Sequence, residues 1–291
     1  MAEAALELTR KAAAVLAERG FTNARLEAEL LLAGVLGIRR LDLYLQHERP
    51  VDGAELDRYR AWVRRRLKHE PLQYIVGTTP FRKLELHVDA RVLIPRPETE
   101  VLVGEVLSWA KARSSWGAAL DVGTGSGAIA LSLAHEGRFA QIVATDVSPD
   151  ALDVARENAV RVGLSDVVQF RCGACFEPLR SGERFAAIVA NPPYVADTER
   201  ARLAPEVRDH EPPAALFAGP DGLRVIAALI AGAPHWLDSG GLLALEIGDG
   251  QAEMVLDCVR ATGAYASARA VPDLTGRMRV LLAERAAHDP E

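Results

Sequence analysis

Apolar residues recur at every third or fourth position along the first part of the chain, which is the period of an amphipathic helix. Gly20 and Gly37 end the first two helical segments, and a third runs from Asp52 to His69. No alternation of β-branched residues interrupts this pattern, so we expect residues 1–75 to form a small helical domain. Its inward-facing positions are predicted to be Leu6, Ala13, Leu16, Ala17, Leu26, Leu30, Leu31, Val35, Leu56, Tyr59, Trp62, Val63 and Leu67.

The pattern then changes from a helical period to the alternation of short strands. Ile75-Val76-Gly77 and the segment from Leu84 to Val88 alternate in this way, and Gly77 to Pro80 suits a turn between them. We therefore expect residues 76–95 to form a β-hairpin that links two domains.

From residue 96 onward, short apolar runs alternate with helical segments. Runs without a polar face are typical of strands that are covered on both sides. The best-defined helix extends from Asp150 to Val162, with Ser148 as its N-cap, Pro149 as its first residue and Gly163 as its end. This order predicts an α/β fold with a doubly wound parallel sheet in residues 96–286. The expected strands are 119–122, 141–146, 167–172, 185–190 and 242–247, with a last one at 279–283 that pairs antiparallel.

Charge argues against a nucleic-acid binder. The net charge is -6, and residues 1–75 carry 13 Lys and Arg against 11 Asp and Glu, so the remainder holds a net -8 that repels phosphate. One basic run, Arg58, Arg60, Arg64, Arg65, Arg66 and Lys68, is interpreted as a solvated helix face. The alternative is a contact surface for an acidic partner or for phosphates.

Three cysteines, an odd and low number, indicate a reducing compartment without a disulfide framework. Cys172 and Cys175 have the spacing of a zinc site, but no second Cys or His pair accompanies them, so we expect no metal. The chain has no apolar run of membrane-spanning length, and its acidic start, Met1-Ala2-Glu3, does not suit a secretory signal. We therefore expect a cytoplasmic protein with no membrane association.

A glycine-rich segment leaves the first strand of the α/β domain and enters a helix. Gly123, Gly125 and Gly127 alternate with Thr124 and Ser126, which lets the backbone turn sharply and approach a ligand closely. The spacing differs from the G-x-G-x-x-G of nicotinamide-binding proteins, which disfavours an oxidoreductase. It is also not a P-loop, because no Gly-Lys-Ser/Thr follows.

Asp146 ends the second strand and strengthens this interpretation. An acid at that place can accept hydrogen bonds from both hydroxyls of a ribose. The loop has no Lys or Arg for phosphates, which favours S-adenosylmethionine over NAD or ATP. Gly123, Thr124, Gly125, Ser126, Gly127, Asp146 and Asn191 are therefore the predicted cofactor-binding residues.

The tetrapeptide Asn191-Pro192-Pro193-Tyr194 follows the fourth strand. Two prolines fix the backbone and remove two donors, which leaves the Pro192 carbonyl free to accept. Together with the Asn191 side-chain carbonyl it can hold the two hydrogens of a planar NH2 group, and Tyr194 can pack against a flat substrate. An amide nitrogen held in this way points its lone pair at a methyl donor, so Asn191 and Pro192 are the predicted catalytic residues.

The motifs together resemble the HemK/PrmC family, whose members are class I, Rossmann-like methyltransferases that use S-adenosylmethionine. The resemblance covers nearly the whole chain. It implies methylation of the side-chain nitrogen (N5) of the glutamine in the Gly-Gly-Gln motif of peptide chain release factors, and we expect a monomer. It also implies that Arg96 and Glu98 shape the entrance of the cofactor pocket, with ion pairing between the domains as the alternative. The segments that carry it are 70–77, 94–100, 121–127, 191–194 and 211–223.

One segment departs from the family pattern. Relatives commonly carry an acidic residue after the third strand, where this chain has Gly173-Ala174-Cys175-Phe176. We therefore expect adenine to pack against Phe176 without that acceptor.

Two other functions fit part of the sequence. Asn-Pro-Pro-Tyr also occurs in methyltransferases that act on adenine N6 or guanine N2 of nucleic acids, but these would need basic charge near Asn191. A cofactor-binding protein without enzymatic activity would need a degraded acceptor site, and residues 191–194 are intact.

Overall fold

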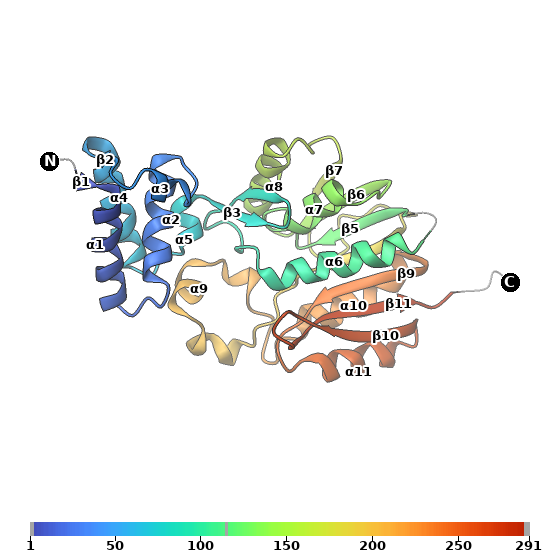
Figure 1. The fold of residues 1–291 in the computed structure, drawn as a ribbon. Coiled ribbons are helices and arrows are strands. Elements are labelled where there is room, and N and C mark those ends of the chain that lie inside the picture. Colours follow the sequence, from blue (N-terminus) through green and yellow to red (C-terminus); the bar gives the residue numbers. More distant parts are fainter. Residues whose placement is uncertain (1–2, 114–115, 288–291) are drawn as a thin grey trace. The chain divides into compact units, whose positions relative to one another are not determined.

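The computed structural model describes residues 3–113 and 116–287, and the chain divides into two compact units (Figure 1). The first unit contains the chain up to Thr78 together with the short segment Ala204–His210. The second contains residues 79–203 and 211–291. None of the helices in the described residues is long and apolar enough to cross a membrane.

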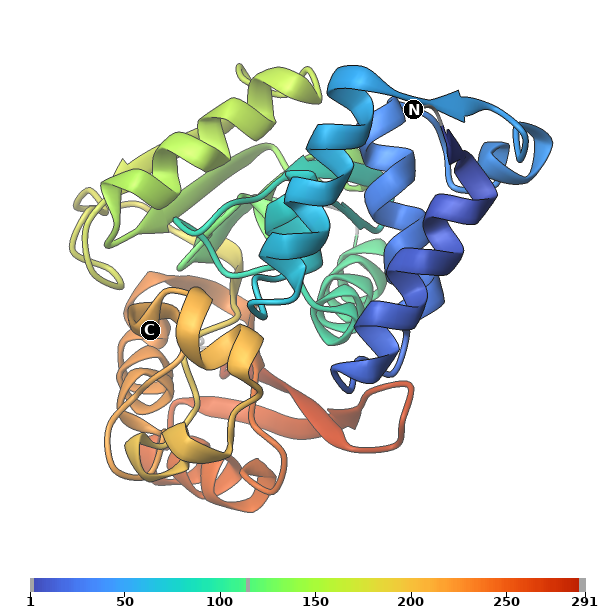
Figure 2. The same cartoon turned by 90° about the vertical axis from the view of Figure 1, so that its left-hand side faces the viewer.

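The first unit is helical, as predicted. In Figure 2, α1 and α2 run side by side, and a common core of buried residues that includes Leu16, Leu31 and Tyr59 joins α1, α2 and α4. Two short strands pair antiparallel, β1 (Glu3–Ala4) with β2 (Pro50–Val51). The helices are α1 (Ala5–Glu18), α2 (Ala24–Leu36), α3 (Asp42–Leu45), α4 (Gly53–Arg66), α5 (Leu72–Val76) and α9 (Pro205–His210).

The buried faces of α1 and α2 are rotated from those predicted. Helix α1 buries Ala5, Leu8, Thr9, Ala12 and Leu16, whereas Leu6 and Ala13 are half-buried and Ala17 is exposed. Leu26 is also exposed, because α2 turns Ala28, Leu31, Leu32 and Val35 inward. Alanines and leucines occur on all sides of both helices, so the spacing of apolar residues alone does not identify the face that is buried.

The interpretation of the basic run as a solvated helix face is wrong for Arg66, which is buried. Its side chain is 2% exposed and pairs with Glu27 (2.6 Å) and Glu206 (2.8 Å) inside the first unit. The guanidinium also lies 4.3 Å from the centre of the Phe21 ring. A buried guanidinium needs such partners to offset its loss of hydration. Arg58 and Arg64, by contrast, are exposed.

The hairpin is present, but its position differs from the prediction. Ile75 and Val76 belong to helix α5, which ends at Gly77 with a φ of +86°. The paired strands are β3 (Thr78–Phe81) and β4 (Leu84–His87), so the turn lies at Arg82 and Lys83 and not at Gly77 to Pro80. The backbone hydrogen bond from Gly77 N to Gln73 O, 2.7 Å long, closes a helical turn where alternation suggested a strand.

The second unit is an α/β fold, which confirms the predicted class. Its seven-stranded sheet has the order β10-β11-β9-β8-β5-β6-β7, and β11 pairs antiparallel with both β9 and β10. The other four pairings, β9 with β8, β8 with β5, β5 with β6 and β6 with β7, are all parallel. The strands are β5 (Ala118–Val122), β6 (Gln141–Asp146), β7 (Val168–Cys172), β8 (Phe185–Ala190), β9 (Leu237–Glu246), β10 (Tyr265–Pro272) and β11 (Met278–Arg285).

Helices cover both faces of this sheet, as continuous apolar strands require. On one face, Ala119 packs with buried residues of α6 and α7, and on the other Leu120 packs with those of α10 and α11 (Figure 1). Ser148 caps α8 by accepting from Ala151 N at 3.2 Å, as the sequence indicated. The helices are α6 (Pro97–Lys111), α7 (Ala128–Glu136), α8 (Pro149–Arg161), η1 (Asp197–Arg202), η2 (Pro213–Ala215), α10 (Arg224–Trp236) and α11 (Ala252–Thr262).

Candidate active site

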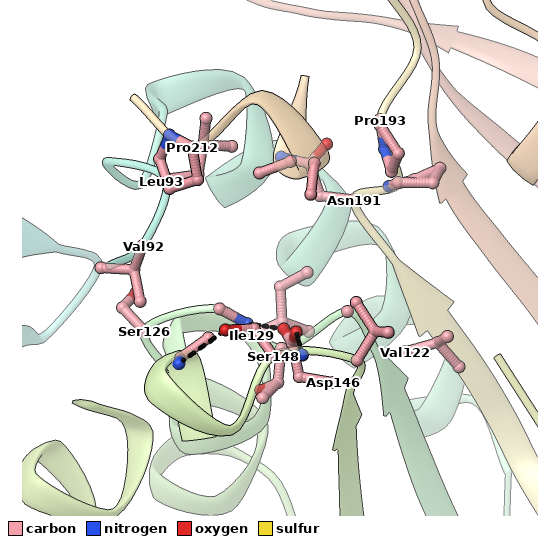
Figure 3. A pocket seen from close by; sticks show the side chains of 18 of the residues that line it. Val92, Leu93, Val122, Ser126, Ile129, Asp146, Ser148, Asn191, Pro193 and Pro212 are labelled. Carbon is pink, nitrogen blue, oxygen red and sulfur yellow. Dashed lines mark hydrogen bonds between the residues drawn. The ribbon is translucent and has the colours of Figure 1, made fainter. Parts of the chain in front are cut away.

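A cavity of about 340 Å³ lies at the carboxyl ends of β5, β6 and β8, where loops of an open parallel sheet form binding sites. Figure 3 shows Asp146 and Ser148 across the open space from Asn191 and Pro193. Of the predicted site residues, Gly123 to Ser126, Asp146 and Asn191 to Pro193 line this one cavity, whereas Gly127 does not.

The glycine loop adopts the backbone that only glycine tolerates easily. Gly123, Gly125 and Gly127 have φ values of +74°, +54° and +84°. A Cβ on Gly123 or Gly125 would meet no protein atom within 4 Å, whereas one on Gly127 would press against Leu131 at 3.0 Å. The first two glycines therefore keep space open beside the loop, and the third permits close helix packing.

Asp146 holds the loop as well as facing the cavity. Its Oδ2 accepts from Gly125 N and its Oδ1 from Ser148 N, both at 2.9 Å (Figure 3). Burial raises the pKa of Asp146, and the backbone donors at Ser148 and Gly125 act against that rise. Each carboxylate oxygen can accept more than one hydrogen bond, so both retain capacity for a ribose.

A second acid, Asp121, lies beneath the loop, and sequence reasoning did not assign it a role. Its Oδ2 accepts from Thr124 Oγ1 at 2.6 Å and from Ala130 N at 3.0 Å, which ties the loop to the start of α7. Its Oδ1 is buried and has no hydrogen-bond partner within the described part of the chain. Burial raises the pKa of Asp121 to about 7.

Asn191 and Pro192 each carry an acceptor that faces no donor from the described residues. Among the described residues, no donor bonds to Asn191 Oδ1 or to the Pro192 carbonyl. The Asn191 Nδ2 atom donates to Thr99 Oγ1 at 3.0 Å. Two acceptors beside a cavity match the two hydrogens of a planar NH2 group, the chemistry that the sequence predicted.

Tyr194 is placed differently from its neighbours. Its ring packs with the core on the α10 side of the sheet and is not among the side chains that line the cavity in the described residues. Its hydroxyl donates to Glu246 Oε1 at 3.3 Å. Burial raises the pKa of Tyr194 above its ordinary value.

Thr99 and Glu246 join the site from two other elements, and no sequence motif had indicated Glu246. Thr99, in the first turn of α6, donates from Oγ1 to Glu246 Oε2 at 2.5 Å. Glu246 is the last residue of β9, and burial raises its pKa to about 7. A chain of contacts therefore runs from Glu246 through Thr99 to Asn191. The sequence signal that could have identified Glu246 is its place as the single acid at the end of an apolar strand.

In the loop after β7, Ala174 and Cys175 stand where the resemblance led us to expect an acidic residue, and both line the cavity. Phe176 does not line it. Its ring stacks near Trp236, with centroids 6.4 Å apart, and packs against Gly232 of α10. The expected packing of adenine on Phe176 is therefore wrong for this geometry, because the ring fills a gap over the helix.

Arg96 pairs with Glu211 at 2.5 Å, and both residues belong to the second unit. The pair brings the start of α6 to the residue just before Pro212, which lines the cavity. This placement fits a role in shaping the cavity and does not correspond to an ion pair between the units.

Comparisons with known proteins identify the family. Residues 7–77 match the PrmC N-terminal domain, and residues 99–207 match the methyltransferase small domain. A release factor glutamine methyltransferase of Geobacter sulfurreducens is 46% identical over 248 residues, which are 85% of this chain and 85% of that protein. One of Moorella thermoacetica is 45% identical over 270 residues, which are 93% of this chain and 94% of that protein.

A solved structure supports the fold alone. The N-terminal domain of human METTL16, in complex with SAH, has a TM-score of 0.52 and 16% identity, and the match covers 71% of this chain and 76% of that one. The much closer sequence relatives extend over both the helical and the α/β parts of the chain. The chain therefore belongs to the family of release factor glutamine methyltransferases.

Proposed function

We propose that this protein transfers a methyl group from S-adenosylmethionine to the side-chain nitrogen (N5) of the glutamine in the Gly-Gly-Gln motif of peptide chain release factors. Family membership supports the reaction class. The observation that carries the proposal is the pair of acceptors, Asn191 Oδ1 and the Pro192 carbonyl, to which none of the described residues donates, in the cavity that Asp146 also lines.

The cavity fits the cofactor in size and in chemistry. Its volume of about 340 Å³ lies in the range of small-molecule sites. Open space beside Gly123 and Gly125 leaves room for a ligand against the backbone of residues 123–125. The Asp146 carboxylate suits ribose hydroxyls, and Val147, Ala174 and Leu229 offer apolar contacts for a flat ring. Bound there, S-adenosylmethionine supplies an electrophilic methyl group on a sulfonium.

The substrate amide is a poor nucleophile because its nitrogen lone pair is delocalised into the carbonyl. Asn191 Oδ1 and the Pro192 carbonyl each accept one of its two hydrogens, which fixes the plane of the NH2 group. Holding the nitrogen in one orientation supplies much of the acceleration, since aligned reactants avoid an entropic cost. Pro193 stiffens the backbone that carries both acceptors.

We assign the remaining roles on the same basis. Residues 1–75 recognise the release factor, residues 76–95 link the two domains, and residues 96–286 bind the cofactor and carry out methyl transfer. The protein acts as a monomer in the cytoplasm. Nucleic acid is not a substrate, because the chain beyond residue 75 carries a net -8.

Labelled S-adenosylmethionine tests this function. The protein is incubated with a release factor, with a release factor whose Gly-Gly-Gln glutamine is changed to glutamate, or with nucleic acid. Mass spectrometry should place the label on the Gly-Gly-Gln glutamine and find none on the glutamate variant. Label on adenine or guanine, or none on the release factor, would contradict the proposal.

A further inference from the structure

We propose that Thr99 and Glu246 are positioning residues that decide which end of the Asn191 amide faces the substrate. The inference rests on the proposed function, because it concerns the acceptor that holds the glutamine amide. An Asn side chain presents an acceptor at one end and a donor at the other. Only the acceptor end suits a substrate NH2 group, so the amide must be prevented from turning over.

The Thr99 hydroxyl has a single hydrogen, and this hydrogen is donated to Glu246. The distance from Thr99 Oγ1 to Glu246 Oε2 is 2.5 Å, which is typical of a hydroxyl that donates to a carboxylate. Toward Asn191 the hydroxyl can therefore only accept, and Asn191 Nδ2 lies 3.0 Å away. This order turns Nδ2 toward Thr99 and leaves Oδ1 for the substrate.

Burial stabilises this arrangement of donors and acceptors. Thr99 is 3% exposed and Glu246 is 1% exposed, so water cannot readily replace either partner. The second oxygen of Glu246 accepts from the Tyr194 hydroxyl at 3.3 Å, so both carboxylate oxygens act as acceptors. Thr99, Asn191 and Glu246 lie at the start of α6, directly after β8 and at the end of β9, all within the second unit.

Turning the Asn191 amide over would give two mismatches at once. Oδ1 would face the lone pairs of Thr99, whose hydrogen points to Glu246, and Nδ2 would face the hydrogens of the substrate amide. Each mismatch leaves a polar group without a partner in a water-poor site. The network therefore selects the productive orientation and contacts the substrate only through Asn191.

Three variants separate positioning from a merely structural role. Thr99→Val keeps the shape of the side chain and removes the hydroxyl, and Thr99→Ser keeps the hydroxyl. Thr79→Val is the matched control, because Thr79 is a buried threonine of the same unit that does not line the cavity. Each is measured for single-turnover methylation of a release factor, for S-adenosylmethionine affinity by calorimetry, and for thermal unfolding.

We expect Thr99→Val to slow methyl transfer roughly 10- to 100-fold, since a misplaced reacting group costs about that much. Cofactor affinity should stay within about twofold, a small change on the scale of 1.4 kcal/mol per tenfold. Thr99→Ser should restore most of the rate, and Thr79→Val should match the wild type in rate.

Two results would overturn the inference. One is a Thr99→Val enzyme with the wild-type rate, and the other is a rate loss matched by an equal loss of cofactor affinity. Methylation of the release factor by the wild type is measured first. If the wild type is inactive, the proposed function fails, whereas an active wild type with an equally active Thr99→Val removes only the positioning role.

Discussion

The Asp146 carboxylate both holds the glycine loop and faces the cavity. It accepts from Gly125 N and Ser148 N, and it lines the cavity where a ribose would lie. Removing the carboxylate therefore affects both the ligand and the shape of the loop. Hydrogen bonds to a charged group are worth about 1.5–3 kcal/mol each, which sets the scale of the loss.

We expect Asp146→Ala to weaken S-adenosylmethionine binding at least roughly 10-fold, because such bonds are lost together. Asp146→Asn should lie between Ala and the wild type, since it keeps one acceptor oxygen. Isothermal calorimetry measures both. An unchanged affinity in the alanine variant would remove the ribose assignment.

Glu246 links activity and stability to pH in opposite directions. Burial raises its pKa to about 7, and the groups that face it are Thr99, Tyr194, Glu98 and Arg279. Only the ionised form has two oxygens that act solely as acceptors, for Thr99 and for Tyr194, so methyl transfer should rise as pH increases through about 7. A raised folded-state pKa means the reverse for stability: this contribution is fully present below the unfolded pKa and is lost as pH rises through about 7.

Glu246→Gln should remove both effects of this group. Single-turnover rates of the wild type should fall as pH drops through the region of the raised pKa, and those of the variant should stay level. Urea unfolding of the two proteins at the same pH values isolates the contribution of Glu246 from that of Asp121, whose pKa is also raised to about 7. Parallel pH profiles for the two enzymes would contradict this assignment.

At the scale of the element, a matched pair of glycines separates the role of the glycine loop in cofactor binding from the effect of a left-handed backbone on stability. Gly125 and Gly163 both have positive φ, +54° and +72°, and a Cβ on either would meet no protein atom within 4 Å. Gly125 lines the cavity, whereas Gly163 follows the end of α8 and does not.

Gly125→Ala and Gly163→Ala should therefore lose similar stability, about 1–2 kcal/mol each, from the left-handed backbone. Only Gly125→Ala should weaken cofactor binding, since its methyl group enters the open space. Thermal unfolding and calorimetry on both variants provide the comparison. Equal cofactor affinity in the two would show that the space beside Gly125 is not used by the ligand.

Local signals explain which elements could be predicted from the sequence. Runs such as Phe185–Ala190 are apolar throughout and bounded by polar residues, so their assignment as buried strands was secure. The sequence does not predict β10, because most of its residues are exposed at the sheet's edge and form no apolar pattern. The two β-branched residues Ile75 and Val76 favour a strand by their type, whereas the structure places them in the short helix α5.

The site shows the same division between local and long-range information. Gly123 to Gly127 and Asn191 to Pro193 are contiguous motifs, so sequence reasoning found them. Glu246 and Thr99 are 147 residues apart along the chain, and only the fold brings them together. The burial of Arg66 likewise depends on Glu206, which lies 140 residues further along the chain.

At the scale of the whole molecule, the division into two units predicts the effect of removing the helical unit. The second unit has two apolar clusters of its own, one on each face of its sheet, so it should fold without the helical unit. The segment Ala204–His210, however, packs with the first unit, where Arg66 pairs with Glu206. That segment is followed directly by Glu211, the partner of Arg96.

Deleting residues 1–75 should leave a folded protein that binds S-adenosylmethionine nearly as well as the full chain. Methylation of an intact release factor should fall steeply, because the domain that we propose recognises it and the packing partner of residues 204–210 are both lost. Circular dichroism, calorimetry and a methylation assay measure the three properties. Full activity of the truncated enzyme would contradict a recognition role for residues 1–75.

The central claim is that Asn191 and Pro192 hold the two hydrogens of the substrate amide, and Asn191→Ala tests it most directly. With release factor and S-adenosylmethionine both saturating, single-turnover methyl transfer should fall about 100-fold, the cost expected for a misplacement of ~1 Å. Cofactor affinity should change little, because Asp146 and the glycine loop are untouched. Transfer at near the wild-type rate would contradict the account, since another group would then have to orient the glutamine.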